Sequence, residues 1–266
     1  MSFCTFSHSA IAIATLLVGS FASAEEFRPN CESPSFPTPA PSEALGIDHQ
    51  CGLVGSGGAE AKQNTAKNNF CATGEPKPIT IEELKKLQTR VDNDHSINFG
   101  DRNTSLRHRG PTTNRGPLEA MGEGNVVTFR GFVLKARQEG HESVNCGQNV
   151  PDEAQFHDIH ISLVAAKDVR DECSGIVAEM VPHHRPATWT QENVQKVADA
   201  ALPVRVTGQL LFDSSHVPCE RGNPVGSNPK RMSLWEVHPI YKFEICTSDC
   251  DGTGNWLDLD AWAKQH

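Results

Sequence analysis

The stretch that most constrains the fold runs from Pro203 to Cys246, because it holds two long segments in which apolar and polar residues alternate. A strand places successive side chains on opposite faces, so each segment predicts a half-buried strand. Pro239 falls inside the second segment, where a residue without a backbone N–H predicts a bulge or a sheet edge. The expected inward side chains are Val204, Val206, Gly208, Leu210 and Phe212 in PVRVTGQLLFD, and Trp235, Val237, Tyr241, Phe243 and Ile245 in LWEVHPIYKFEIC.

Three further strands and one helix precede these two segments. GNVVTFRGFVLKA, FHDIHISLVA and CSGIVAEMVP alternate in the same way, with a bulge expected at Gly131. WTQENVQKVADAAL has helical periodicity and begins after a capping residue, Thr190. Three strands, a helix and two strands is the order of the OB-fold, a five-stranded Greek-key barrel. The predicted fold class is therefore mainly β: an OB-like barrel with one helix between strands three and four, plus a Cys-rich N-terminal extension.

Four segments also carry a resemblance to a protein family. GEGNVVTFRGFVLKA, FHDIHISLV, VRVTGQLLFDSSH and LWEVHPIYKFEIC together resemble a family of uncharacterised, exported bacterial proteins with an OB-like barrel. The resemblance covers roughly residues 120 to 246, and CGLVGSGG with QNTAKNNFC resembles an extension found in some members. It implies a barrel and an exported location, and it implies no reaction.

The N-terminus has the pattern of a secretory signal peptide. A short apolar core from Ala10 to Val18 is followed by the small residues Ala22-Ser23-Ala24. The segment before the core has no Lys or Arg, which leaves a buried helix as the competing interpretation. No later segment approaches the ~20 apolar residues that a membrane span needs. We therefore expect a secreted or periplasmic protein with no membrane span after signal removal.

Composition divides the chain into five parts. Thr80 and Glu83 have the spacing of a capping box, which predicts a helix that packs on the barrel. Trp256, Leu257 and Trp262 in the acidic tail are expected to dock on the barrel as well. The predicted parts are a signal peptide (1–24), a Pro/Cys-rich extension (25–78), a helix with a basic linker (79–118), the barrel (119–248) and the acidic tail (249–266).

Cysteine usage supports an oxidising compartment. An even number of cysteines remains after the signal peptide, which argues for disulfides, and no CxxC pair is present. Barrel geometry predicts a Cys173–Cys219 pair, and it predicts that Cys146 lies near Cys246 or Cys250. The expected disulfide cysteines are Cys31, Cys51, Cys71, Cys146, Cys173, Cys219, Cys246 and Cys250.

The candidate site lies on the outer face of strands two, three and five, where OB barrels bind ligands. His160 and His238 would flank Glu179, because adjacent strands lie ~4.8 Å apart. His184 could join from the loop after strand three. The candidate ligand-binding residues are Asp158, His160, Glu179, Asp213, His216, Glu236 and His238.

This set of side chains is compatible with three roles. Two imidazoles and a carboxylate can hold a divalent metal, so His160, Glu179 and His238 are candidate metal ligands. The same side chains could instead form a structural ladder of cross-strand hydrogen bonds. They could also contact a ligand that is not a metal.

The leading functional hypothesis is an exported, disulfide-stabilised binding module whose ligand is unassigned. Fold analogy alone points to an oligosaccharide or a nucleic acid. The net charge of −9 disfavours nucleic acid, although Arg221, Lys230 and Arg231 lie together before strand five. The first alternative is a metal-dependent hydrolase that uses the outer His/Glu cluster and metal-bound water. The second is a protein-interaction module whose extension contacts a partner, so whether the chain is an enzyme stays open.

Overall fold

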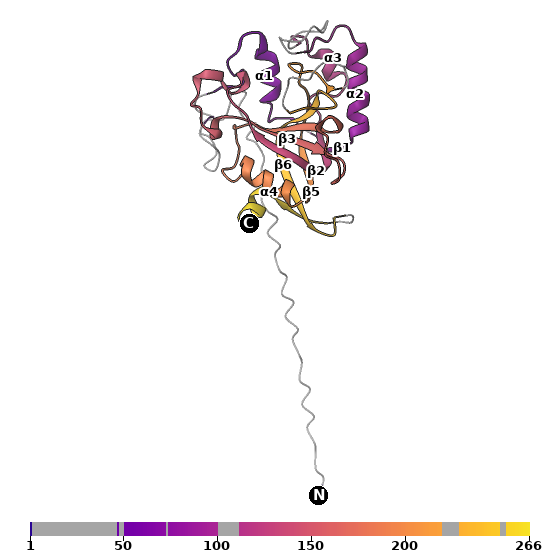
Figure 1. The fold of residues 1–266 in the computed structure, drawn as a ribbon, viewed down its shortest axis with the longest axis vertical. Coiled ribbons are helices and arrows are strands. Elements are labelled where there is room, and N and C mark those ends of the chain that lie inside the picture. The colour runs from indigo at the N-terminus through magenta and orange to yellow at the C-terminus, as the bar shows by residue number, and fades with distance from the viewer. Residues whose placement is uncertain (2–46, 48–50, 73, 101–111, 220–228, 251–253) are drawn as a thin grey trace.

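The computed structural model describes Met1, Ile47 and residues 51–72, 74–100, 112–219, 229–250 and 254–266. Its core is a sheet that closes into a barrel, with helices at both ends (Figure 1). The strands are β1 (Lys77–Ile79), β2 (Val126–Gln138), β3 (Ile159–Val164), β4 (Ile176–Met180), β5 (Pro203–Phe212), β6 (Trp235–Ser248) and β7 (Asn255–Asp258). The α-helices are α1 (Ala61–Lys67), α2 (Ile81–Asn93), α3 (Gly116–Glu119), α4 (Gln191–Asp199) and α5 (Leu259–Ala263).

The strand order around the barrel is that of the OB-fold. The sheet runs β2-β3-β4-β6-β5, and β5 pairs with β2 to close it. The β4–β6 pair is parallel and the other four pairs of the barrel are antiparallel. Helix α4 connects β4 to β5, at the position expected for the OB helix. These findings confirm the predicted fold class.

The barrel core follows the alternation of the sequence. The inward residues expected on four of the strands are buried in one hydrophobic cluster, from Val127 on β2 to Phe212 on β5. On β6 the prediction was wrong at Tyr241, because Ile240 points into the core instead. The β5–β6 register shifts on either side of Gly208, which faces Ile240, so the alternation is interrupted at Ile240 and Tyr241 and resumes with Phe243 and Ile245 in the core. A bulge at Pro239 was expected, and its effect on Tyr241 was not.

The bulge expected at Gly131 lies elsewhere. Gly131 pairs in register with Val204, and the irregularity falls between Val133 and Lys135. The glycine has a different role, because a side chain there would collide with the Val164 carbonyl and the Phe129 ring. The neighbouring backbone approaches so closely that only a residue without a side chain fits at position 131.

Helix α2 begins with the predicted capping box and packs on the barrel. The Thr80 hydroxyl accepts from the Glu83 N–H at 3.2 Å, and the Glu83 carboxylate accepts from the Thr80 N–H at 2.9 Å. Leu84 and Val91 are fully buried in the barrel core. Among the helices of the described residues, none has the length and apolar character needed to cross a membrane.

Three disulfides join described cysteines. Cys173–Cys219 forms as predicted. The expectation for Cys146 was wrong, because it bonds Cys51 while Cys246 bonds Cys250 across the turn after β6. The loop that carries Cys146 packs against the N-terminal extension, where Ser56 N–H donates to Ser143 O at 2.8 Å. Cys71 is disulfide-bonded too, and Cys31 lies outside the described residues.

The C-terminal segment docks on the barrel as expected. Strand β7 pairs with β6, and Leu259 and Trp262 are buried in the barrel core. The Trp256 ring lies under two guanidinium groups, Arg205 at 4.7 Å and Arg130 at 5.1 Å from its centroid. In Figure 1 this segment and α4 lie below the strands, and α1 and α2 lie above them.

Candidate functional site

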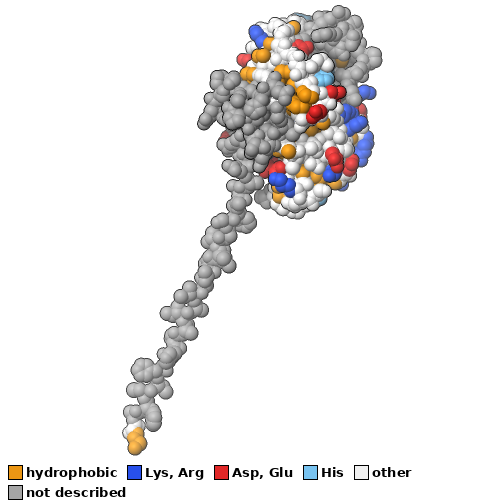
Figure 2. Space-filling view, turned by 90° about the vertical axis from the view of Figure 1, so that its left-hand side faces the viewer, with side chains coloured by type: hydrophobic (Ala, Val, Ile, Leu, Met, Phe, Trp, Pro, Cys, Tyr) orange, Lys and Arg blue, Asp and Glu red, His pale blue; other side chains and the backbone are white. Residues whose placement is uncertain are grey.

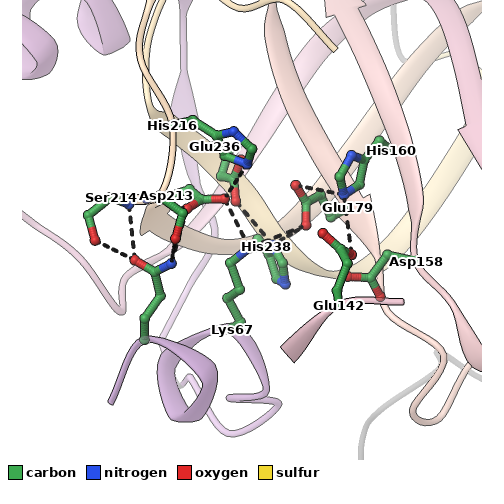
Figure 3. A network of polar contacts seen from close by, with 12 residues as sticks. Lys67, Glu142, Asp158, His160, Glu179, Asp213, Ser214, His216, Glu236 and His238 are labelled. Atoms are coloured by element: carbon green, nitrogen blue, oxygen red, sulfur yellow. Dashed lines mark hydrogen bonds and ion pairs between the residues drawn. The ribbon is translucent and has the colours of Figure 1, made fainter. Parts of the chain in front are cut away.

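A set of charged side chains lies between the outer face of the barrel and α1 (Figure 3). Lys67 comes from α1, and the other members come from the barrel strands and the loops that join them. Gln209 on β5 donates to the Ala66 carbonyl at 2.7 Å, which holds α1 against the barrel. We call this set the polar cluster: Lys67, Glu142, Asp158, His160, Glu179, Asp213, Arg231, Glu236 and His238.

Glu179 is the centre of the polar cluster. His160 Nε2 lies 3.2 Å from one of its carboxylate oxygens, and His238 Nδ1 lies 2.8 Å from the other. These contacts follow from register, because His160 pairs with Glu179 across β3–β4 and Ala178 pairs with Val237 across β4–β6. The sequence-based expectation that two histidines flank this carboxylate therefore describes the observed arrangement.

A second part of the polar cluster surrounds Asp213, just after β5. Lys67 Nζ donates to Asp213 Oδ2 at 2.9 Å and lies 3.9 Å from Glu179. Arg231 Nη1 donates to Glu236 at 2.7 Å, and Glu236 lies 3.0 Å from His238 Nδ1. These contacts join the two parts into one network.

The polar cluster contains more carboxylates than permanent cations, and this imbalance sets the pKa values of its histidines. Burial opposes charge on His238, but Glu179 and Glu236 offset it and raise the pKa to about 9. The pKa of His160 is also raised well above its usual range, because Glu179 and Glu142 outweigh burial. Both pKa shifts favour the protonated imidazoles, whose positive charge offsets the carboxylates.

The pKa values of the carboxyl groups are shifted in opposite directions. Burial alone would raise the pKa of Glu179, but His160 and Lys67 hold it well below the usual range. Burial and the neighbouring Glu179 raise the pKa of Glu236. Loss of solvent and the nearby Asp158 raise the pKa of Glu142. The polar cluster thus contains both a firmly ionised carboxylate and carboxyl groups that take up protons readily.

Several of these side chains could hold a cation together. One ligand atom from each of Asp158, Glu179 and His238 lies within 4.8 Å of the other two, and all three residues are buried. Glu142, Asp158 and His160 form a second such group, which shares Asp158 with the first. Within the described residues, Asp158 Oδ2 and His238 Nε2 make no hydrogen bond. These two atoms could therefore bind a metal without losing a hydrogen bond, whereas both oxygens of Glu179 already contact histidines.

The outer face is covered, which the sequence analysis did not anticipate. His160, Glu179 and His238 are at most 3% exposed, because α1 and the loop between β2 and β3 lie over the face. Glu142 and His216, whose side chains are 25% and 23% exposed, form its more accessible edge. The extension that supplies α1 is held there partly by Cys51–Cys146.

The other candidate residues have distinct positions. Asp158 precedes β3 and accepts from Asn145 Nδ2 at 2.9 Å. His216 Nε2 lies 3.4 Å from Asp213 Oδ2, and burial together with Arg231 lowers its pKa to about 4. His184 packs its ring edge-on against Phe70, 4.8 Å between centroids, on the side where Tyr241 also packs.

Three members of the polar cluster were missed by sequence reasoning. Lys67 and Gln63 lie on one face of α1 at a spacing of four residues, and both contact Asp213. The signal available was a short helix with a polar stripe and no apolar face. Glu142 lies in the loop before β3, where nothing in the local pattern marks it. Arg231 was considered only as a basic residue of the loop before strand five that could contact nucleic acid.

Arg231 also bears on nucleic-acid binding. It is fully buried and paired with Glu236, so it is not the exposed nucleic-acid contact that was considered. Arg221 lies outside the described residues. In the described part of the face shown in Figure 2, Lys and Arg side chains lie mainly along the right-hand edge, with Asp and Glu side chains beside them. The acidic side chains beside the basic ones weaken the attraction of this edge for a phosphate backbone.

Comparisons of the chain with protein-family models, with curated proteins and with solved structures found no match. The resemblance to exported bacterial proteins therefore stays a prediction from the quoted segments. The functional argument depends on the site itself.

Proposed function

We propose that the protein is an exported, disulfide-stabilised barrel that binds a divalent cation in the polar cluster. Asp158, Glu179 and His238 would be the ligands, with Glu142 and His160 beside them. The disulfides and the Ala22-Ser23-Ala24 pattern support the exported location.

The observation that carries the proposal is the Asp158–Glu179–His238 group. Its three ligand atoms converge within 4.8 Å in a site that is closed to solvent. Burying carboxylates is costly unless a cation or hydrogen bonds compensate them. Lys67 and Arg231 compensate Asp213 and Glu236, whereas no lysine or arginine of the described residues forms an ion pair with Asp158 within 4.0 Å. A divalent cation would add positive charge beside Asp158, which in the described residues has Arg185 at longer range and a hydrogen bond from Asn145.

The donor set favours a particular class of ion. Mixed imidazole and carboxylate ligands suit Zn²⁺, Mn²⁺ or Fe²⁺, whereas Ca²⁺ and Mg²⁺ favour sites made of oxygen atoms alone. Binding requires neutral His238, so the ion would displace the proton that this imidazole carries in the metal-free protein.

The covered face also explains why an ion is preferred over an oligomeric ligand. Oligosaccharides and nucleic acids bind OB barrels on an open face. Here α1 and Gln209 occupy that surface, and among the described side chains of the site Glu142 and His216 are the partly exposed ones. A small ligand such as a metal ion fits this arrangement without displacing α1.

Metal binding to the purified, chelator-treated protein tests the proposal. We expect the parent to bind Zn²⁺ or Mn²⁺ in the polar cluster, and Asp158→Asn and His238→Ala to weaken that binding at least about tenfold. His95→Ala is the matched control, because His95 is exposed on the surface. Equal affinity in all four proteins, measured by isothermal titration calorimetry, would overturn the assignment.

Hydrolysis is a second candidate function, favoured by one observation. Glu236 touches His238 at 3.0 Å and has a raised pKa, so a carboxyl group that can exchange protons adjoins a proposed ligand. A metal-activated water beside it would be a nucleophile. If this holds, Glu236→Gln will retain the metal and lose hydrolysis of a nitrophenyl ester or phosphodiester. A metal-loaded parent without such activity would leave cation binding as the function.

A further inference from the structure

Two histidines and an aspartate gather on the loop that joins β2 to β3, outside the polar cluster. His141 and His157 each precede a member of that cluster in the chain, Glu142 and Asp158. The backbone is extended at Glu142 (φ −120°, ψ 149°) and at His157 (φ −122°, ψ 157°). Successive side chains of an extended chain point to opposite sides. Glu142 and Asp158 therefore point into the polar cluster, and His141 and His157 point away from it.

The three side chains converge on one point. Asp152 Oδ1 lies 3.8 Å from His141 Nε2 and 3.5 Å from His157 Nε2. The two imidazole rings meet edge to face, with centroids 4.7 Å apart and an angle of 85° between their planes. One ligand atom from each residue lies within 4.8 Å of the other two. Small side-chain rotations would bring all three to the ~2 Å distance of zinc ligands.

His141 is oriented as metal-binding histidines usually are. Its Nδ1 lies 2.8 Å from the Gly147 carbonyl oxygen, which can only accept, so Nδ1 carries the proton. In the neutral ring Nε2 is then left with a lone pair, directed at Asp152. A backbone carbonyl that holds one ring nitrogen while the other binds the ion is a common arrangement around protein-bound metals.

His157 supplies an independent sign of a missing ligand. The residue is 2% exposed, and within the described residues neither ring nitrogen makes a hydrogen bond, although Nε2 lies at an ion-pair distance of 3.5 Å from Asp152. Its backbone is firmly held, because Arg185 and Gln138 donate to its carbonyl at 2.8 and 3.2 Å. A buried imidazole without hydrogen bonds is unfavourable unless another partner satisfies it. Its Nε2 points at the position where a metal would lie between His141 and Asp152.

We propose that His141, Asp152 and His157 form a second metal site, separate from the polar cluster and suited to Zn²⁺. Two imidazoles and one carboxylate supply three of the four ligands of a tetrahedral zinc ion. The Asp152 side chain is 84% exposed, so the fourth position faces solvent and takes water. The site goes beyond the proposed function and does not depend on it.

Titration of the metal-free, full-length mature protein with Co²⁺ tests this site, because tetrahedral Co²⁺ has strong visible absorption. Asp152→Asn is the informative variant, since an exposed side chain can be changed without disturbing the core. Glu153→Gln is the matched control, with the same chemical change at the next, exposed position. We expect Asp152→Asn to weaken Co²⁺ binding at least about tenfold and Glu153→Gln to leave it unchanged.

Combining these variants with Asp158→Asn separates the two sites. If the Asp152→Asn effect persists in the Asp158→Asn background, the loop site stands whatever happens at the polar cluster. If Asp158→Asn abolishes all Co²⁺ binding while Asp152→Asn matches Glu153→Gln, this inference is overturned and the proposed function is retained. A parent that binds no Co²⁺ would reject both sites.

Discussion

Lys67 is the residue through which α1 joins the polar cluster. It donates to Asp213 and approaches Glu179, and both carboxylates are fully buried. Lys67→Met would leave these charges without their main permanent cation. We expect it to lower the free energy of unfolding of the metal-free protein by about 3–5 kcal/mol, since breaking a buried pair strands the other charge.

The matched control for that substitution lies on the same helix. Lys62 is exposed on α1 and does not belong to the polar cluster. Lys62→Met therefore makes the same change in charge and helix propensity as Lys67→Met, but away from the buried carboxylates. Urea denaturation of both variants measures the difference. Equal stability of the two variants would show that Lys67 does not compensate the buried carboxylates.

At the scale of single residues, strand alternation predicted much of the site. Alternation placed Glu179 with Glu236 and His238 on one face, and pairing brought His160 beside Glu179. Alternation did not predict that this face is buried, because a polar face of a strand is normally exposed to solvent. Lys67 could not be assigned, because its partners are more than 100 positions away in the sequence.

At the scale of elements, the Cys51–Cys146 disulfide ties the extension to the loop before β3. It spans 95 residues, whereas Cys246–Cys250 spans 4. A crosslink that closes a longer loop removes more entropy from the unfolded chain. We expect the double variant Cys51→Ser/Cys146→Ser to lower the free energy of unfolding by about 4–5 kcal/mol. The double variant Cys246→Ser/Cys250→Ser should lower it by about 2 kcal/mol. Thermal unfolding that ranks the two double variants in the opposite order would contradict this account.

The pairing of β5 with β6 predicts a pH dependence. Arg205 donates to both oxygens of Glu244 at 2.6 Å, next to Lys242. Burial opposes the charge on Glu244, but these two cations hold its pKa below the usual range. A carboxyl with a lowered pKa stabilises the fold above its unfolded pKa of about 4.3, and this contribution is lost as pH falls through the folded value.

Glu244→Gln reports that contribution directly. The parent should be more stable than the variant at pH 7, and the gap should shrink as pH falls below about 4.3. Guanidinium chloride unfolding at a series of pH values measures it. A gap that stays constant down to pH 3 would mean that the carboxylate charge contributes nothing to the pairing.

The same element shows where pattern reading fails. Alternation assigned Tyr241 to the barrel core, but the β5–β6 register is irregular around Gly208, and Ile240 enters the core in place of Tyr241. Tyr241 instead donates to the Asn69 carbonyl at 2.6 Å and helps hold the extension. Pro239 predicted a bulge or a sheet edge, but nothing in the local sequence predicted that Tyr241 would contact a segment about 170 positions earlier.

At the scale of the whole molecule, the N-terminal extension turns an OB face into a closed site. Helix α1 lies where an oligomeric ligand would bind an open barrel, and the loop between β2 and β3 covers the rest. That loop contributes Glu142 and Asp158 on its inner side and His141, Asp152 and His157 on its outer side. One loop thus separates two candidate metal sites with different access to solvent.

The measurement that tests the central claim most directly is anomalous X-ray diffraction from crystals grown with Zn²⁺, recorded on both sides of the zinc absorption edge. The account predicts a zinc peak inside the polar cluster, at ~2.0–2.2 Å from atoms of Asp158, Glu179 and His238. A refined structure with no peak there, and with His238 still paired to Glu179 as in the metal-free network, would show that the polar cluster is a structural ladder of charges.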